Sequence, residues 1–357
     1  MYTRSDTAMT QKGIHTFEEI MSQPAVWQDT LGVFQARAAD LQTFWEDGAF
    51  DEVIFTGCGS THYLSLVGAT LFQHLTGMPT RAYPASELVF YPPYRPDKKY
   101  LLVMVSRSGT TTETVEAARV FQEMGAGQSI GVGCDSDSTL MQLADFALVA
   151  DSAREESVAQ TRSFSSMLLL VQLLAAYLGG KGDASTLSAV PEAGEHLLTT
   201  YHEVARQLGE DRAIERFFFL GSHMRYGIAC ESMLKLKEMS LSYGEAFHVL
   251  EFRHGPMSMV NDQTLMIGLL GDNTYTHEAA VLQEMQARNA QVLAVANQHR
   301  LEWPNAITFG VDLPEWGRPV LYLPVLQLMA YYRALMNGQN PDQPQSLTAV
   351  VSLDNLR

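Results

Sequence analysis

Two short stretches of glycine and hydroxyl side chains are the first places in this sequence where ligand chemistry could occur. Residues 56–63 read T-G-C-G-S-T-H-Y, and residues 103–114 read V-M-V-S-R-S-G-T-T-T-E-T. Each stretch begins with or follows an apolar run typical of a β-strand, and each leads into a helical pattern. A helix N-terminus offers free N–H groups and a partial positive charge, and glycine lets the backbone approach an anion. Both stretches therefore predict a phosphate site.

The same residues also have a purely structural interpretation as turn formers and helix N-caps. The phosphate interpretation is favoured because α/β folds bind ligands at the carboxyl ends of their strands, and here two such turns occur in successive β-α units. Ser106, Ser108 and Thr111 would then supply neutral hydrogen-bond donors. Neither stretch is a nucleotide fingerprint, since both lack G-x-G-x-x-G and G-x-x-x-x-G-K-S/T.

A second group of reactive side chains lies between residues 231 and 256. Glu231, Lys235 and Glu238 stand at i, i+4 and i+7, so one helix face carries all three. His254 follows on a Gly-Pro turn, where side chains tend to be aimed. An ordinary solvated charged face is the other interpretation of this spacing. A carboxylate that moves a proton between C2 and C1, with a histidine that opens the ring, is what carbohydrate isomerisation requires.

The histidines and cysteines do not form the pattern of a metal site or a disulfide framework. His223, His248 and His254 share no recognised ligand spacing, so zinc is not expected. The proton transfers described above need no metal, and no cofactor is expected. The three cysteines are far apart and contain no C-x-x-C, which fits a reducing, cytoplasmic compartment. Cys58 lies between two glycines of the first stretch. It is either a nucleophile or a small packing residue, and packing is the commoner role.

The residues around these stretches alternate between strand and helix patterns. Expected strands in the first half are residues 52–56, 100–106, 128–132 and 146–150, with helices that begin near Thr61, Thr111 and Ser138. This alternation predicts a parallel sheet with right-handed crossovers. Residues 179–194, rich in Gly, Ser, Ala and Pro, predict an inter-domain connection that leads into a helix at 196–208.

The second half repeats the first. Expected strands are residues 216–221, 264–270, 291–296 and 307–311, with helices at 228–241 and 320–336. The stretch F-L-G-S-H-M-R-Y-G parallels F-T-G-C-G-S-T-H-Y, but G-D-N-T-Y-T replaces the second hydroxyl-rich stretch. A duplicated fold in which only the first copy keeps the full phosphate loop accounts for both facts. The tail after residue 339 could lie across a site or bind a neighbouring molecule.

Composition limits the possible partners. The chain has 357 residues, enough for two domains, and its formal net charge of −16 makes duplex nucleic acid and anionic membranes poor candidates. The N-terminus lacks the apolar core of a signal peptide, and the apolar run at residues 167–178 is too short to span a bilayer. An anionic substrate must therefore be held by a local site.

Six motifs together resemble the tandem SIS (sugar isomerase) domain family over roughly residues 25–357. They are G-C-G-S-T, S-R-S-G-T-T, E-S-V-A-Q-T-R-S-F, E-S-M-L-K-L-K-E, E-F-R-H-G-P and D-Q-P-Q-S-L. The chain is most similar to the isomerase half of glucosamine-6-phosphate synthase and to stand-alone amino-sugar-phosphate deaminases and fructosamine-6-phosphate deglycases. The resemblance implies an α/β fold of two SIS-type doubly wound domains, with parallel sheets flanked by helices, in a homodimer.

The resemblance also implies site residues. Glu238 is the expected enediol base, and His254 is the expected ring-opening residue, which in this family tends to reach across a dimer interface. The residues implied to bind the substrate and its phosphate are Ser60, Thr61, Ser106, Arg107, Ser108, Thr111, Val158 and Gln160. Gly59, Gly109, Glu231 and Lys235 are implied to support them, without metal or cofactor.

Three positions depart from the synthase pattern. Arg107 stands where the synthase often has glutamine, Gln160 stands where it has serine, and Ala349 stands where its tail carries a lysine that helps to open the sugar. A glutaminase half is also not expected, because the chain is too short and residue 2 is Tyr2 rather than a cysteine nucleophile. These departures favour the deaminase or deglycase relatives.

The expected organisation is a lead-in at 1–44, a first SIS domain at 45–180, a linker and helix at 181–205, a second SIS domain at 206–338 and a tail at 339–357. The expected reaction converts an amino sugar 6-phosphate, with glucosamine 6-phosphate as the leading candidate, into a ketose 6-phosphate and ammonia. A fructosamine-6-phosphate deglycase is the alternative within the class. A non-catalytic phosphosugar-binding or regulatory protein is the alternative from another class.

Overall fold

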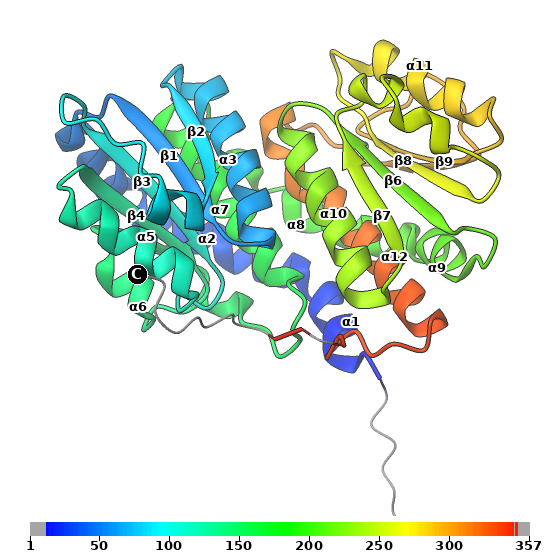
Figure 1. Cartoon of the computed structure of the whole chain (residues 1–357), viewed down its shortest axis with the longest axis horizontal. Helices are drawn as coiled ribbons and strands as arrows, with labels where there is room; N and C mark the ends of the chain where they lie inside the picture. The colour runs from blue at the N-terminus through cyan, green and yellow to red at the C-terminus, as the bar shows by residue number, and fades with distance from the viewer. Residues whose placement is uncertain (1–11, 346, 349–357) are drawn as a thin grey trace, which may run out of the picture.

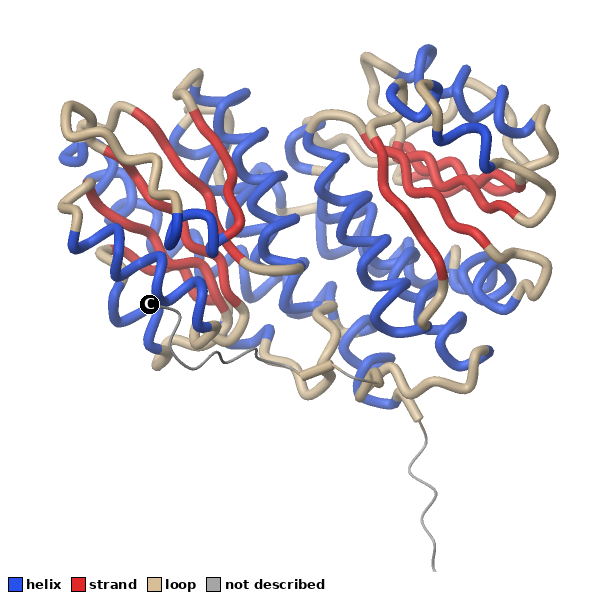
Figure 2. Tube along the Cα trace, in the orientation of Figure 1, coloured by secondary structure: helices blue, strands red, loops and turns tan. Residues whose placement is uncertain are grey.

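The computed structural model describes residues 12–345, 347 and 348. Two five-stranded sheets stand on either side of a central group of helices that includes α3 and α10 (Figure 1). Each sheet has helices against its faces (Figure 2). All strand pairs are parallel, as the alternation of strands and helices predicts. The expected α/β class with two doubly wound sheets is confirmed.

The first sheet has the order β2-β1-β3-β4-β5. Its strands are β1 (Glu52–Gly57), β2 (Thr80–Pro84), β3 (Tyr100–Ser106), β4 (Gly127–Gly133) and β5 (Phe146–Val149). The helices between and after them are α3 (Ser60–Thr76), α4 (Ala85–Phe90), α5 (Thr112–Glu123), α6 (Thr139–Leu143) and α7 (Arg162–Leu178). Chain direction across the sheet reverses between β1 and β3, and this is where doubly wound folds bind ligands.

The second sheet has the order β10-β9-β8-β6-β7, which is the first order repeated strand for strand. Its strands are β6 (Arg216–Gly221), β7 (Tyr243–Phe247), β8 (Thr264–Leu269), β9 (Gln291–Ala296) and β10 (Asn305–Thr308). Its helices are α10 (Met224–Ser240), α11 (Tyr275–Gln286) and α12 (Leu323–Met336). The shared order supports the duplication that the two similar sequence stretches indicate.

Four further helices connect and brace the sheets. They are α1 (Ile14–Met21), α2 (Gln23–Gly48), α8 (Val190–Thr200) and α9 (His202–Glu210). The sequence predicts a single helix at 196–208 after a connection at 179–194, and both expectations are wrong in detail. Helix α8 already begins at Val190, with a proline in its first turn where the missing N–H costs nothing. The chain then breaks at Tyr201 before α9.

The sequence patterns also missed β2 and β7. Both are short edge strands with largely half-exposed or exposed residues, so neither contains the apolar run that reveals the central strands. Strand β1 and strand β3, in contrast, are buried along their whole length. The last strand is displaced: it covers Asn305–Thr308 rather than 307–311.

One hydrophobic core runs through both halves of the molecule. It contains side chains of the first sheet such as Phe55, of α7 such as Leu170, and of α12 such as Leu328, all fully buried. Helices α3 and α10 pack against each other within it. A Cβ at Gly227 would lie 2.6 Å from the carbonyl oxygen of Tyr63, so glycine permits this close approach. The described part of the chain contains no helix long and apolar enough to cross a membrane.

Candidate active site

A small cavity of about 120 Å³ lies where the loop after β1 meets the loop after β3. Its lining comes from five separate segments of the chain. The lining residues are Cys58, Gly59, Ser60, Arg107, Val158, Gln160, Lys235, Glu238, Leu347 and Thr348. The cavity thus lies at the point of the first sheet where doubly wound folds bind ligands. Leu347 and Thr348 show that the segment after α12 reaches this cavity.

The loop after β1 is braced by Thr61. The Thr61 hydroxyl oxygen accepts from the amide of Cys58 at 2.9 Å and donates to the carbonyl oxygen of the same residue at 2.9 Å. A Cβ at Gly57 would lie 2.6 Å from this hydroxyl, so glycine is needed there. Gly59 has φ +56°, a conformation that L side chains rarely adopt. Ser60 lines the cavity, whereas Thr61 does not.

The loop after β3 is folded by its own hydroxyls. Ser106 Oγ accepts from the amide of Gly109 at 3.1 Å, and Ser108 Oγ accepts from the amide of Thr110 at 3.2 Å. Gly109 has φ +61°. Thr111 caps the N-terminus of α5 by its position. Because the serine oxygens accept these bonds, their protons can still be donated to an anion.

Arg107 connects the loop after β3 to the segment that contains Val158 and Gln160. Its Nη1 donates to the carbonyl oxygens of Val158 at 2.9 Å and Ser157 at 3.3 Å. Its Nη1 also lies 3.7 Å from the fully buried carboxylate of Glu155. Arg107 therefore positions the wall of the cavity as well as contributing charge to it.

Glu155 organises the same wall, although no sequence motif assigns it a role. Its Oε1 accepts from the amide of Thr161 at 2.7 Å and from the amide of Ser163 at 3.1 Å. Glu19 of α1 also holds this segment, accepting from the amide of Glu156 at a distance of 2.6 Å. In the sequence, this role of Glu155 is indicated only by two adjacent glutamates, Glu155 and Glu156, before a hydroxyl-rich stretch.

Lys235 is the centre of the polar cluster on α10. Its side chain is 1% exposed, and its Nζ donates to Ser60 Oγ at 3.0 Å. The same Nζ forms an ion pair with Glu238 and lies 3.5 Å from Glu231 Oε1. Burial alone would lower the pKa of Lys235, but the two carboxylates outweigh it and raise this pKa. Lys235 therefore carries a positive charge into the cavity wall.

The two carboxylates of the cluster differ in environment. The Glu231 side chain is fully buried, and burial raises its pKa to about 8, which the nearby Lys235 only partly opposes. The Glu238 side chain is 21% exposed and lines the cavity. Glu231 therefore holds its proton near neutral pH. Glu238 is the carboxylate placed to reach a ligand.

Not every candidate residue lies in this cavity. His254 is exposed on the turn between two short helices, Glu251–Arg253 and Pro256–Met259, and does not line it. Ala349 lies outside the described residues.

Burial raises the pKa of the Cys58 thiol, whose Sγ lies 3.5 Å from Thr114 Oγ1. A neutral thiol fits the packing role of Cys58 better than that of a nucleophile.

The repeated sheet order, with a glycine loop at the same point of each sheet, defines a duplicated doubly wound α/β protein. The chain belongs to the SIS domain family, whose profile matches residues 51–177 and 212–335. The tandem arrangement that the motifs indicate is thereby confirmed.

Relatives in sequence are glutamine–fructose-6-phosphate aminotransferases of the isomerizing kind. The chain is 29% identical to that of Acidithiobacillus ferridurans over 94% of this chain and 58% of the relative. It is 30% identical to that of Thermus thermophilus over 95% of this chain and 59% of the relative. The chain thus spans about three fifths of the length of these relatives.

Two solved structures are similar over their whole length. Glucosamine-6-phosphate deaminase from Thermotoga maritima is 28% identical, with a TM-score of 0.78, over 95% of this chain and 100% of that one. Tagatose-6-phosphate ketose/aldose isomerase from Escherichia coli has a TM-score of 0.85 over 100% of both chains. At 24% identity, the second likeness shows the fold alone. The fold is that of the SIS phosphosugar isomerases.

Proposed function

We propose that this protein converts an amino sugar 6-phosphate, with glucosamine 6-phosphate as the leading candidate, into a ketose 6-phosphate and ammonia. The observation that carries the proposal is the pair formed by Glu238 and the buried Lys235 at the wall of the loop cavity. A site that only binds a sugar phosphate does not need a carboxylate held against a desolvated ammonium. The likeness to the Thermotoga maritima deaminase over its full length supports the same reaction.

Glu238 is the proposed base. In the open-chain amino aldose it removes the proton from C2 and returns it at C1, which passes through an enolamine and yields the imine at C2. Water then adds to the imine carbon, and ammonia leaves as the ketose forms. Lys235 directs the Glu238 carboxylate through their ion pair, while its bond to Ser60 Oγ fixes the ammonium.

The loop after β3 is the proposed phosphate site. The N-terminus of α5 supplies backbone N–H groups and a partial positive charge, and Ser106 and Ser108 supply hydroxyl donors. Arg107 adds a full positive charge in a chain whose net charge is −16. A local site of this kind is what holds a phosphate on an acidic protein.

His254 is the proposed ring-opening residue, supplied by a second copy of the chain. Within one chain it is exposed and does not line the cavity, so it needs a neighbour to reach a sugar. Imidazole is suited to this step because its ordinary pKa is close to neutral pH. A dimer with shared sites follows from this assignment.

The test is an ammonia-release assay with glucosamine 6-phosphate on the purified protein and on Glu238→Gln. The amide keeps the shape of the side chain but cannot take a proton, so the rate should fall at least about 100-fold. Binding of the substrate should remain, measured as thermal stabilisation of both proteins.

Ammonia release that is equal in the two proteins would overturn the role of Glu238. Absence of release in the wild type, with clear stabilisation by the sugar phosphate, would instead favour the fructosamine-6-phosphate deglycase. That reaction uses the same base on an adduct with a larger amine substituent. Fructosamine 6-phosphate with an amino acid substituent is then the substrate to assay.

A further inference from the structure

The second sheet has its own cavity at the point that corresponds to the active site of the first. The direction of the second sheet reverses between β6 and β8, as it does between β1 and β3 in the first. A cavity of about 340 Å³ lies there, within the range of about 300–1,000 Å³ typical of small-molecule sites. Its lining residues are His74, Leu75, His223, Met224, Arg225, Asn273, Thr274, Glu315 and Trp316.

The repeat relates the two cavities residue by residue. Helices α3 and α10 start after N-caps of the same conformation, Gly59 (φ 56°, ψ −122°) and His223 (φ 57°, ψ −133°). Counted from these caps, His74 stands in α3 where Glu238 stands in α10, since residue pairs 59/74 and 223/238 have equal separations. The catalytic cavity combines the start of α3 with Glu238, and the second cavity combines the start of α10 with His74.

Arg225 gives the second cavity a different charge from the first. Its side chain is 4% exposed, with Nη1 2.7 Å from Glu315 Oε1 and Nη2 3.6 Å from Glu278 Oε1. Its Nε has no hydrogen-bond partner among the described residues. A Cβ at Gly271 would lie 2.1 Å from Nη2, so glycine leaves the space that the guanidinium fills. The positive charge of Arg225 is thus already neutralised by carboxylates.

The loop after β8 does not resemble a phosphate loop. It contains Asp272, which pairs with Arg318 at 2.7 Å, followed by Asn273 and Thr274. Of the charged groups in these pairs, only Arg225 and Glu315 line the cavity, and Arg225 is paired with Glu315 and with the buried Glu278. Arg318 is paired with Asp272, and Arg300 donates to the Asp272 carbonyl oxygen at 2.9 Å. Because the arginine of the lining already has carboxylate partners, this site favours an uncharged ligand, or one that carries an amine, over a phosphate.

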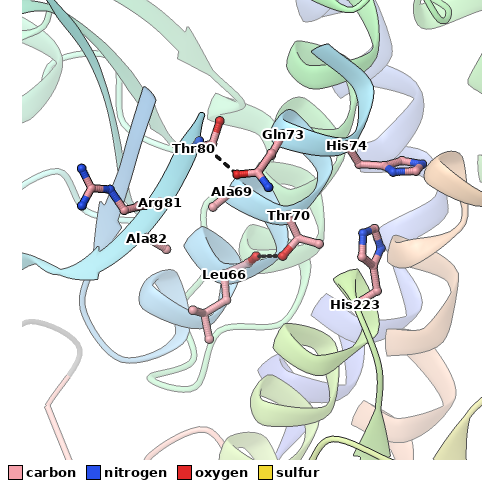
Figure 3. A pocket seen from close by; sticks show the side chains of 9 residues that line it. All are labelled: Leu66, Ala69, Thr70, Gln73, His74, Thr80, Arg81, Ala82 and His223. Atoms are coloured by element: carbon pink, nitrogen blue, oxygen red, sulfur yellow. Dashed lines mark hydrogen bonds between the residues drawn. The ribbon is translucent and has the colours of Figure 1, made fainter. Parts of the chain in front are cut away.

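Two imidazole rings form the border of the cavity. His74 of α3 and His223 at the start of α10 face each other, with ring centroids 5.2 Å apart and an interplanar angle of 81° (Figure 3). Both rings also line a neighbouring cavity of about 570 Å³ that runs along α3 and the edge strand β2 (Figure 3). Burial is the largest cause that lowers the pKa of His223, and the nearby His74 and Arg225 lower it further. A neutral imidazole can both donate and accept a hydrogen bond to a hydroxyl.

We propose that the cavity between β6 and β8 is a second sugar site, which takes a hexose or hexosamine without a phosphate group. Imidazole nitrogens and the Glu315 carboxylate are acceptors for sugar hydroxyls, and the Asn273 amide and Thr274 hydroxyl both donate and accept. Trp316 supplies an aromatic ring to the wall. The site is independent of the proposed reaction, because it shares no lining residue with the catalytic cavity.

Isothermal titration with glucose and with glucosamine tests the proposal. The four proteins to compare are the wild type, His74→Ala, Asn273→Ala and Glu238→Gln. His74 and Asn273 are exposed, so His74→Ala and a second variant, Asn273→Ala, should fold normally, which thermal unfolding checks. We expect one saturable site in the wild type for at least one sugar, with affinity reduced about tenfold by either cavity variant. Glu238→Gln should bind as the wild type does.

Absence of binding by both sugars would overturn the proposal. So would binding that both His74→Ala and Asn273→Ala leave unchanged, or that Glu238→Gln abolishes, because the sugar would then occupy another place. Glucosamine 6-phosphate added at saturation should not displace the unphosphorylated sugar. Displacement would assign both ligands to the catalytic cavity.

Discussion

At the residue scale, Glu231 and Glu238 share one lysine but differ in what surrounds them. Glu238 is in direct contact with Lys235 and faces the cavity, whereas Glu231 is fully buried and 3.5 Å from the same ammonium. One positive charge cannot stabilise two desolvated carboxylates equally, so the buried one keeps its proton. Two identical side chains on one helix face thereby differ in burial and in their distance from the same ammonium.

The protonation of Glu231 predicts a pH dependence of stability. The unfolded chain releases this proton near pH 4.5, whereas the folded protein keeps it up to a pKa of about 8. The folded state therefore binds more protons between these values, and Glu231 lowers the free energy of unfolding as pH rises through this window. Glu231→Gln, whose amide resembles the protonated carboxyl, should remove this loss.

Urea unfolding of wild type and Glu231→Gln at pH 5 to 8 measures the difference. The stability of the variant relative to the wild type should increase with pH, by at most about 1.4 kcal/mol per pH unit. A difference that stays constant over this window would show that Glu231 is ionised in the folded state. Glu195, an exposed glutamate of α8, is the matched control, and Glu195→Gln should give a constant difference.

A second prediction at the residue scale concerns Arg107. Arg107→Gln removes a positive charge beside the proposed phosphate site and the bonds to the segment that holds Val158. We expect KM for the sugar phosphate to rise about tenfold or more, with a smaller change in kcat, because charged hydrogen bonds contribute about 1.5–3 kcal/mol. Steady-state kinetics separates the two effects. Arg119→Gln, at an exposed arginine of α5 that pairs with Glu116, is the control and should change neither constant.

At the element scale, the packing of α3 against α10 sets the distance between Ser60 and Lys235. A Cβ at Gly227 would lie 2.6 Å from both the Tyr63 carbonyl oxygen and Val67 Cγ2. Gly227→Ala should therefore push the helices apart, destabilise the protein by about 1–3 kcal/mol and lower the catalytic rate. Thermal unfolding and the ammonia assay measure both effects.

Gly32→Ala is the matched control for the helix contact. Gly32 also lies inside a helix, but a Cβ there meets nothing within 4 Å. Alanine at this exposed position should stabilise the protein by about 0.5–1 kcal/mol, since it has the higher helix propensity. Loss of stability at Gly32 as large as at Gly227 would mean that the cost is not steric contact between α3 and α10.

The elements differ in how far their sequences reveal them. Strands β3, β6 and β9 consist mainly of continuous apolar runs, and all three have the predicted bounds. The sequence does not predict the edge strands β2 and β7. Each pairs with a neighbour on one side only and has mostly half-exposed or exposed residues, so its sequence shows no apolar periodicity. The spacing of Glu231, Lys235 and Glu238 predicts their shared face. Nothing local predicts the contact of Lys235 with Ser60, which depends on how the two halves pack.

At the scale of the whole molecule, a single core joins two copies of one fold, and the copies have diverged at equivalent positions. The first copy keeps a glycine, Gly59, at the cap where the second has His223, and α10 keeps Glu238 where α3 has His74. Each cavity uses the start of one helix and the body of the other. Duplication therefore produced two sites that share a framework but not their chemistry.

The proposed contribution of His254 from a second copy gives the last prediction. Glu238→Gln and His254→Ala should each be inactive alone, but mixed dimers of the two regain activity if the site is shared. In such a dimer, one site receives both changes and the other receives neither, because its Glu238 and its histidine come from different subunits. Random mixing at equal amounts makes half of the dimers mixed, so about a quarter of the wild-type activity should return. Each protein alone at the same total concentration is the control. If Glu238 and His254 of the same chain act together, every site in the mixture stays defective and no activity returns.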